Sequence, residues 1–193
     1  MGAREKILAA IKANQPTLTA APDSTIDWMV QYANNTTQFI QVLQGIGGEI
    51  MQVSPSNTLE QILTQLTHNK VFVINTVQLT ELEKEQVNNY AVADLALLDM
   101  AIIQGTLGVA ENGAIWVSES AMGSRVLPFI CEHLVILVNS ATIVSNLAIA
   151  YQQINAFKEG FGVFIAGPSK TADIEQSLVI GAHGPKKCTV ILN

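Results

Sequence analysis

Apolar and polar residues follow two different periods along this chain, and the change from one period to the other predicts alternating strands and helices. Short continuous apolar runs are typical of strands that are buried on both faces of a sheet. Apolar runs of this kind, some of them interrupted by a polar or charged residue, fall at residues 49–53, 71–74, 97–103, 107–110, 114–118, 133–138, 162–166 and 188–192. Most of the predicted strands are therefore expected to lie inside the protein.

Apolar residues spaced three and four positions apart predict helices between these strands. The predicted helices cover residues 4–13, 24–45, 57–66, a segment that starts at residue 80, 142–154 and 171–180. Polar residues typical of helix starts support three of them, namely Ser24 with Asp27, Asn57 with Glu60, and Thr80 with Glu83. Gly181 is placed to end the last helix.

Strand and helix units in this order predict an α/β fold, in which a mostly parallel sheet is flanked by helices on both faces. Asn112-Gly113 lies between two apolar runs and is a strong signal for a tight hairpin. We therefore expect an antiparallel hairpin inserted into the sheet. Residues 1–22 are predicted to form a helix and a linker, and residues 23–193 a single α/β domain.

Composition and charge exclude several classes of protein. Of the 193 residues, 49% are hydrophobic and 13% are charged, and the mean hydropathy is +0.31. The apolar runs are far shorter than the roughly 20 residues that a membrane-spanning helix needs, and the start of the chain lacks the apolar core of a signal peptide. A cytoplasmic protein is expected. The net charge of −6, with dispersed basic residues, argues against a nucleic-acid partner.

Metal and cofactor chemistry lacks the usual sequence signals. Cys131 and Cys188 are too few to hold an iron–sulfur cluster, which needs about four thiolates, and they lie in or beside apolar runs. No set of histidines, cysteines and carboxylates has metal-ligand spacing, and no glycine-rich dinucleotide motif is present. We expect no metal and no cofactor.

The segment from Gly167 to Thr171 is a candidate site for an anion. Gly167-Pro168-Ser169 ends a strand, and Ser169 or Thr171 could cap the helix predicted to follow. The free amides and partial positive charge of a helix N-terminus bind phosphate or carboxylate groups, and both hydroxyls would add donors. The alternative is an ordinary strand-to-helix turn.

Two blocks of sequence resemble the LUD domain, the family of the lactate-utilisation proteins B and C. The C-terminal block consists of Gly167, Pro168, Ser169, Thr171, Ala172, Asp173, Ile174 and Glu175, followed by Gly181, His183, Gly184 and Pro185. Residues 105–117 resemble the central block of the family, which more often has Ala-Glu-Thr-Gly-Thr at its turn, whereas this chain has Asn112 and Ala114. The resemblance covers the chain from about Leu95 onward.

The resemblance implies a fold similar to that of glucosamine-phosphate deaminases, ribose-phosphate isomerases and CoA transferases. It also implies a role like that of the C protein, because the B protein carries a cysteine-rich ferredoxin-like part that this chain lacks. Such a protein would be an accessory component of L-lactate oxidation to pyruvate, would work with iron–sulfur partner proteins, and would bind a small anionic ligand. The ligand is expected to contact Gly167, Ser169, Thr171, Asp173, Asn112, Gly113, Arg125 and His183.

Glu111 suggests a different function. Ala-Glu-Asn-Gly at 110–113 is similar to the motif in which class I CoA transferases place a nucleophilic glutamate. The alternative function is therefore a stand-alone enzyme that acts on an acyl-CoA or a sugar phosphate through Glu111. A carboxylate in this turn could equally cap neighbouring backbone amides. Arg125, in the polar segment Gly123-Ser124-Arg125, could bind a carboxylate or phosphate bidentately or be an ordinary surface charge.

Overall fold

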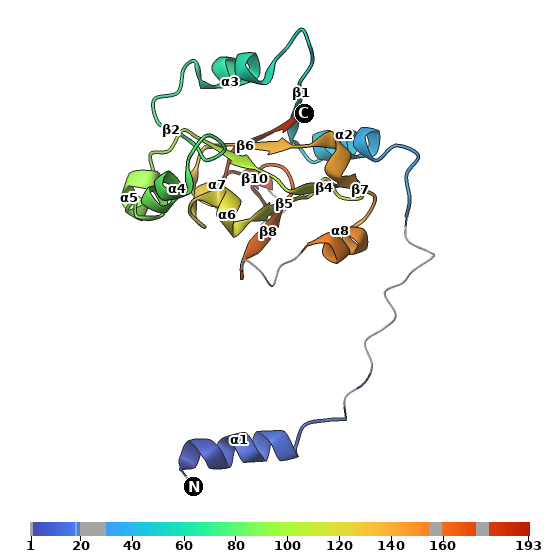
Figure 1. Cartoon of the computed structure of the whole chain (residues 1–193), viewed down its shortest axis with the longest axis vertical. Helices are drawn as coiled ribbons and strands as arrows, with labels where there is room; N and C mark the ends of the chain where they lie inside the picture. Colours follow the sequence, from blue (N-terminus) through green and yellow to red (C-terminus); the bar gives the residue numbers. More distant parts are fainter. Residues whose placement is uncertain (1, 18, 20–29, 155–159, 173–177) are drawn as a thin grey trace.

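The computed structural model describes residues 2–17, 19, 30–154, 160–172 and 178–193. Its helices are α1 (Ala3–Ala13), α2 (Asn35–Gly45), α3 (Leu59–Thr67), α4 (Glu81–Asn88), α5 (Val92–Leu95), α6 (Glu119–Met122), α7 (Leu127–Ile130) and α8 (Leu147–Gln153). Its strands are β1 (Glu49–Gln52), β2 (Val73–Asn75), β3 (Met100–Gln104), β4 (Leu107–Val109), β5 (Ile115–Ser118), β6 (His133–Val138), β7 (Ile143–Val144), β8 (Gly162–Ile165), β9 (Lys170–Ala172), β10 (Leu178–Ile180) and β11 (Lys187–Leu192). Figure 1 shows these elements in one view.

The strands of the described residues form two larger sheets and one hairpin. Five parallel strands lie in the order β1-β11-β6-β3-β2, which confirms the predicted parallel sheet. A mixed sheet has the order β7-β4-β5-β8. The predicted hairpin across Asn112-Gly113 is present as β4 and β5, but it belongs to this second sheet and is not inserted into the first.

The two faces of the parallel sheet pack against different partners. Met100 and Ile102 of β3 pack with Ile62 of α3 on one face. Ala101 and Ile103 point the other way, into the main core. That core includes residues of β5, α2, α6 and α7, and Figure 1 shows α3 on one side of the sheet and β5, α6 and α7 on the other. Helices were predicted to cover both faces, but the mixed sheet covers much of the second face.

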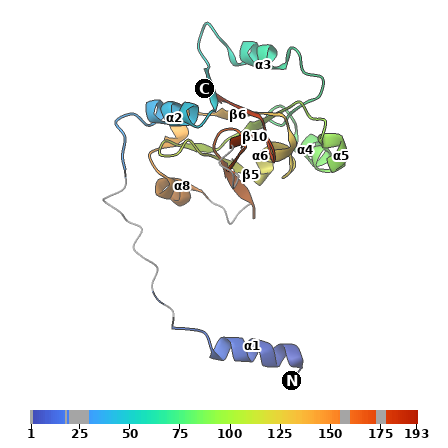
Figure 2. The ribbon, with the colours of Figure 1, turned by 180° about the vertical axis from the view of Figure 1, so that it is seen from behind.

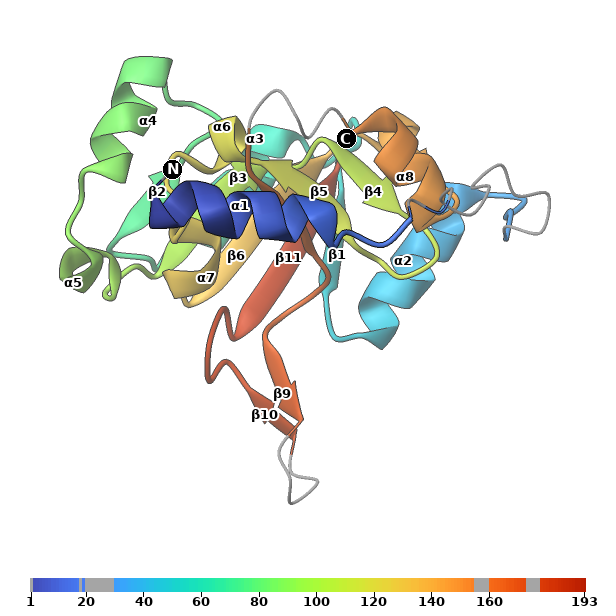
Figure 3. The same ribbon diagram turned by 90° about the horizontal axis from the view of Figure 1, so that it is seen from below.

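The C-terminal region differs most from the prediction. A helix was expected over residues 171–180, yet β9 and β10 pair antiparallel, with Thr171 opposite Val179. Figure 3 shows this hairpin projecting away from the two sheets. Gly181 has the expected positive φ of 78°, but it follows a strand and not a helix. Asp173 lies outside the described residues.

Two other predicted helices are shorter than the sequence pattern indicated. Helix α2 begins after Asn34, whose side chain accepts a hydrogen bond from the Thr37 amide. The predicted start at Ser24 and Asp27 lies outside the described residues. Helix α8 begins after Asn146, which caps the amide of Ile149. Residues 143–144, predicted as helix, form β7 beside β4 instead, because β-branched Ile and Val suit a buried strand pair.

Two predicted strands begin later than expected. Val71 is 98% exposed and Leu97 is 79% exposed, so neither belongs to a buried strand. The carboxylate of Asp99 instead accepts hydrogen bonds from the amides of Val71 and Phe72, which fixes the turn before β2. These bonds hold the pKa of Asp99 below its usual value. Within the described part of the chain, no helix has the length and apolar character needed to cross a bilayer.

Candidate ligand-binding site

A cleft of about 610 Å³ opens between α4 and the turn at residues 123–126. It lies beyond the carboxyl end of β2, where open α/β sheets bind their ligands. Arg125 is a predicted site residue that lines this cleft. The other residues of the lining are Glu81, Lys84, Glu85, Asn88, Glu119, Ser120, Gly123, Ser124 and Val126.

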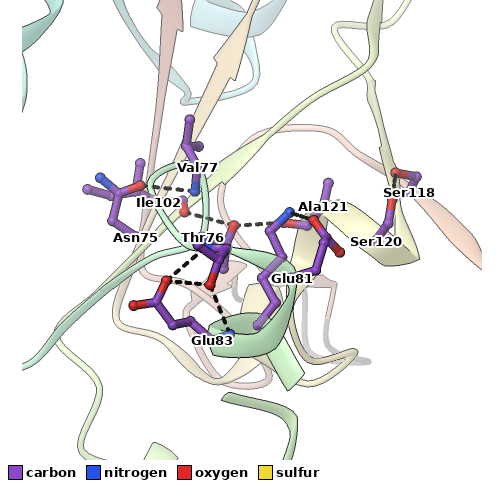
Figure 4. Close-up of polar contacts among 11 residues, drawn as sticks. Asn75, Thr76, Val77, Glu81, Glu83, Ile102, Ser118, Ser120 and Ala121 are labelled. Carbon is purple, nitrogen blue, oxygen red and sulfur yellow. Dashed lines mark hydrogen bonds and ion pairs between the residues drawn. The ribbon is translucent and has the colours of Figure 1, made fainter. Parts of the chain in front are cut away.

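Thr76 lies beneath Gly123 of the cleft lining; it follows β2 and is 1% exposed. Its Oγ1 donates to the carbonyl of Ala121 at 2.7 Å, and it also lies 3.3 Å from the carbonyl oxygen of Ile102 (Figure 4). The bond to Ala121 ties the end of β2 to α6. Gly123 has a φ of 71°, and a Cβ at this residue would lie 3.2 Å from Cγ2 of Thr76. Glycine is therefore needed where the chain turns over the buried threonine.

Helix α4 forms one wall of the cleft and begins where the sequence predicted. Thr80 accepts a hydrogen bond from the Glu83 amide, and the Glu83 carboxylate accepts from the Thr80 amide at 2.8 Å. Hydrogen bonds from the amide and the hydroxyl of Thr80 to the carboxylate lower the pKa of Glu83. The capping box thus orients Lys84, whose Nζ lies 2.8 Å from Glu81 and whose side chain is 19% exposed.

Arg125 is held in place from two sides. Its Nε donates to Oε1 of Glu119, and its guanidinium lies 4.7 Å from the centre of the Phe161 ring. The ion pair with Glu119 raises the pKa of Arg125 above its ordinary value. The two Nη groups have no partner among the described residues, and the side chain is 61% exposed. A planar guanidinium with free donors can bind a carboxylate bidentately.

Glu111 is placed as a helix cap. Its Oε2 accepts a hydrogen bond from the Leu147 amide at 3.0 Å, at the first residue of α8. Oδ1 of Asn112 accepts from the Ala114 amide, and Gly113 has a φ of 70°. This geometry matches the alternative in which the Glu111 carboxylate caps a backbone amide. Because Oε1 has no partner among the described residues, the carboxylate is still accessible to solvent on one side.

The loop from Gly167 to Thr171 lacks the helix on which the anion prediction depended. The Ser169 amide donates to the carbonyl of Pro185 at 2.9 Å, and its carbonyl accepts from the Gly181 amide at 3.0 Å. The Thr171 hydroxyl donates to the carbonyl of Val179. The partners of these groups lie in β10 and in the segment between β10 and β11, and residues 170–172 form a strand, so no helix amides at this point support an anion.

The two predicted motifs nevertheless meet in space. A Cβ built at Gly113 would lie 3.4 Å from Cδ1 of Ile46, and one at Gly167 would lie 3.3 Å from Cγ1 of the same residue. Ile46 follows α2 and precedes β1, so this meeting point is at the amino edge of the parallel sheet and not at its carboxyl edge. Arg125 and Gly167 lie at opposite ends of β8. Arg125 contacts Phe161, which precedes β8, whereas Gly167 follows β8.

His183 is exposed in the segment before β11, at the amino edge of the parallel sheet. The sequence did not single out Thr76 or Lys84. The capping box at Thr80 predicted α4, but no sequence pattern indicated that α4 would lie opposite residues 123–126. A further cleft of about 620 Å³, between α3 and β2, was likewise not predicted.

Both cysteines are buried, and burial raises the pKa of each thiol to about 12. They are therefore neutral thiols near pH 7 and behave as small apolar side chains. Among the described residues, no group of three or more histidines, cysteines and carboxylates could hold a metal ion.

The fold and the cleft define an α/β protein with a candidate anion-binding arginine at the carboxyl edge of a parallel sheet. The LUD domain profile matches residues 3–193. The chain belongs to the LUD domain family, as the two sequence blocks predicted.

Comparison with curated proteins gives distant relatives. Lactate utilization protein C of Bacillus pumilus (strain SAFR-032) is 31% identical over an alignment of 116 residues that covers 57% of this chain and 48% of that protein. Lactate utilization protein C of Macrococcus caseolyticus (strain JCSC5402) is 34% identical over an alignment of 116 residues that covers 57% of this chain and 49% of that protein. The chain spans about half the length of these relatives.

Among solved structures, a DUF162 family protein from Deinococcus radiodurans has a similar fold, with a TM-score of 0.61. The two are 18% identical, and the match covers 85% of this chain and 99% of that one. At this level of identity the likeness establishes the fold alone.

Proposed function

We propose that the protein is a C-type lactate-utilisation protein, an accessory component of L-lactate oxidation to pyruvate that acts with iron–sulfur partner proteins. The observation that carries this proposal is the LUD domain match over residues 3–193, together with relatives named lactate utilization protein C. The ligand is a small monocarboxylate such as lactate or pyruvate, and it binds in the cleft beside α4.

Charge supports a monocarboxylate over a larger anion. Three carboxylates, those of Glu81, Glu85 and Glu119, line the cleft beside only two cations, Lys84 and Arg125. A phosphate or a pyrophosphate would bring two or more negative charges next to these carboxylates, and like charges at short range repel. A single carboxylate on the free Nη groups of Arg125 avoids most of this cost.

The geometry of Glu111 ranks the alternative enzyme lower. Glu111, the nucleophile it would need, caps α8 through Leu147, and a hydrogen bond to Oε2 lowers the nucleophilicity of the carboxylate, although Oε1 has no partner among the described residues. The accessory role does not depend on Glu111.

Growth on lactate tests the proposal. We expect that deleting the gene abolishes growth of the parent organism on L-lactate as sole carbon source, and that a plasmid copy restores it. A copy with Arg125→Gln should restore growth poorly, whereas Lys186→Gln, which removes another exposed and ion-paired cation, should restore it fully. Normal growth of the deletion strain on lactate would overturn the proposed function.

A further inference from the structure

Strand β2 is an edge strand of the parallel sheet, and part of its backbone has no partner among the described residues. It is the last strand in the order β1-β11-β6-β3-β2. The Thr76 amide donates to the carbonyl of Ile102, so the even-numbered residues of this segment bond to β3. The backbone groups of Val73 and Asn75 therefore point away from β3. The Asn75 carbonyl accepts from the Gln78 amide at 3.3 Å, whereas the other outward groups are free within the described part of the chain.

The sequence of this edge carries none of the usual protection against pairing with another chain. Edge strands are commonly protected by charged side chains or by proline. The segment from Val71 to Val77 has no charged residue, no proline and no glycine, and its four valines and one isoleucine favour an extended strand. Strand β1, at the other edge, carries Glu49, which forms an ion pair with Lys187. The β2 edge is therefore the better template for an added strand.

A cleft lies on each face of β2, and the linings of both clefts include Val73 and Asn75. The cleft on the α3 face has a volume of about 620 Å³ and is lined by Leu59 and Leu63 of α3. The cleft on the α4 face has a volume of about 280 Å³ and is lined by Val87 of α4. Figure 1 shows α3 and α4 on opposite sides of β2. Because successive side chains of a strand point to opposite faces, a strand added beside β2 would place them in the two clefts in turn.

The charge of the two clefts indicates which kind of strand fits. Among the described residues, Glu60 is the one charged residue that lines the cleft on the α3 face, and Glu83 is the one that lines the cleft on the α4 face. Lysine and arginine match such clefts, because their aliphatic stems cover apolar side chains while their charged ends stay in water near a carboxylate. A second copy of β2 fits less well, because the segment from Val71 to Val77 has no basic residue and would bring its own glutamates to the same edge.

We propose that the β2 edge binds an extended, basic segment of a partner protein, which adds a strand to the parallel sheet. The amide and carbonyl of Val73 and the amide of Asn75 supply the backbone hydrogen bonds, and the two clefts select lysine or arginine together with apolar side chains. This interaction goes beyond lactate binding and does not depend on it, because Val73 and Asn75 lie outside the lining of the Arg125 cleft.

A short fluorescent peptide in which lysine and valine alternate is the probe, and fluorescence anisotropy measures its binding to the full chain without lactate. Val73→Pro removes one edge amide and should weaken binding by about ten-fold or more. Gln52→Pro is the matched control at the other edge of the sheet. The Val53 amide donates to the carbonyl of Leu192, so the amide of Gln52 points away from β11, and its loss should leave peptide binding unchanged.

The charge requirement is tested separately. The same peptide with glutamate in place of lysine should bind about ten-fold more weakly or worse, because like charges repel. Glu60→Lys should weaken binding of the lysine peptide by about three-fold or more. Glu5→Lys is the matched control, since Glu5 is also an acidic residue in the first turn of a helix but does not line either cleft. It should bind the peptide as the wild type does.

Hydrogen exchange followed by NMR locates the peptide on the wild-type protein. The amides of Val73 and Asn75 should exchange quickly in the free protein, and saturating peptide should slow both by about ten-fold or more, while the amide of Gln52 is unaffected. Protection of Val73 and Asn75 before any peptide is added would mean that another part of the chain or a second copy already pairs with β2. That result, no binding of the lysine peptide, equal weakening by both proline variants, or binding that leaves the two amides unprotected would each overturn the proposal.

Discussion

The two edges of the parallel sheet differ in how their polar groups are used. At the carboxyl edge, Arg125 is held by Glu119 and Phe161 yet keeps free donors beside an open cleft. At the amino edge, His133 is buried against Thr189, and the loop from Gly167 to Thr171 bonds to its own neighbours. The difference supports the proposal that the ligand binds at the carboxyl edge, whereas the polar groups named at the amino edge bond within the fold.

The largest expected effect concerns pH and the closed amino edge. Burial, followed by the positive charge of Lys187, lowers the pKa of His133 to about 4. In the unfolded chain a histidine titrates near 6.5, so between about pH 6.5 and 4 the unfolded state binds the extra proton and the folded state does not. The free energy of unfolding should therefore fall by up to about 3 kcal/mol as the pH decreases through this range.

Urea unfolding at a series of pH values measures this loss. The variant His133→Asn, which retains a polar side chain but does not titrate, should lose much less stability between pH 6.5 and 4. An equal loss in both proteins would show that His133 is not the group responsible.

Next in size is the effect of Gly113→Ala on the contact with α2. A Cβ at Gly113 would lie 3.2 Å from Cα of Leu43, and the φ of 70° is itself unfavourable for alanine. We expect a loss of about 2–3 kcal/mol of stability, measured by urea unfolding. Gly160→Ala is the matched control: it has a φ of 71° but no atom within 4 Å, so it should cost only about 1 kcal/mol. Equal losses of stability in the two variants would show that the contact of the new Cβ with Leu43 adds no cost at Gly113.

At the carboxyl edge, Arg125→Gln should change ligand binding and not stability. Loss of a charge-assisted hydrogen-bonded pair costs about 1.5–3 kcal/mol, so the affinity for L-lactate should fall by roughly ten- to a hundred-fold. The melting temperature should change little, because Arg125 and Glu119 form a partly exposed pair. Titration calorimetry on the variant and on Lys186→Gln checks this. Unchanged affinity in Arg125→Gln would place the ligand elsewhere.

The smallest effect is expected for Glu111→Gln. The amide can still accept from the Leu147 amide, but it loses the charge at the N-terminus of α8, worth about 0.3–1 kcal/mol. Lactate affinity should not change. The opposing hypothesis, that Glu111 is a nucleophile, is tested on the wild-type protein by incubation with acyl-CoA substrates followed by hydride trapping. A trapped glutamyl thioester that is absent in Glu111→Gln would support that hypothesis.

The local parts of the fold could be predicted from the sequence. The parallel strands, the Asn112-Gly113 hairpin and the capping box at Thr80 depend on neighbouring residues, and all are present. The segment after Gly167 was misjudged, because Ser169 and Thr171 favour a helix start locally. The structure instead pairs Lys170 to Ala172 with Leu178 to Ile180 in an antiparallel hairpin. Tertiary context overrides weak local preferences of this kind.

The site was only partly predictable for the same reason. Arg125 was identified as a candidate from its polar surroundings, but its partners Glu119 and Phe161 and the wall formed by α4 come together only through the sheet order. The buried hydroxyl of Thr76 joins β2 to α6 across 45 residues of sequence, and no local pattern indicates such a bond.

A crystal structure of the protein soaked with L-lactate tests the central claim most directly. We predict that the carboxylate of lactate lies within hydrogen-bond distance of the Nη groups of Arg125, in the cleft between α4 and residues 123–126. The same soak of Ser169→Ala should show lactate in the same place, and that of Arg125→Gln should show none. Lactate bound at the loop from Gly167 to Thr171, and lost from it in Ser169→Ala, would contradict the account and return the site to the amino edge of the sheet.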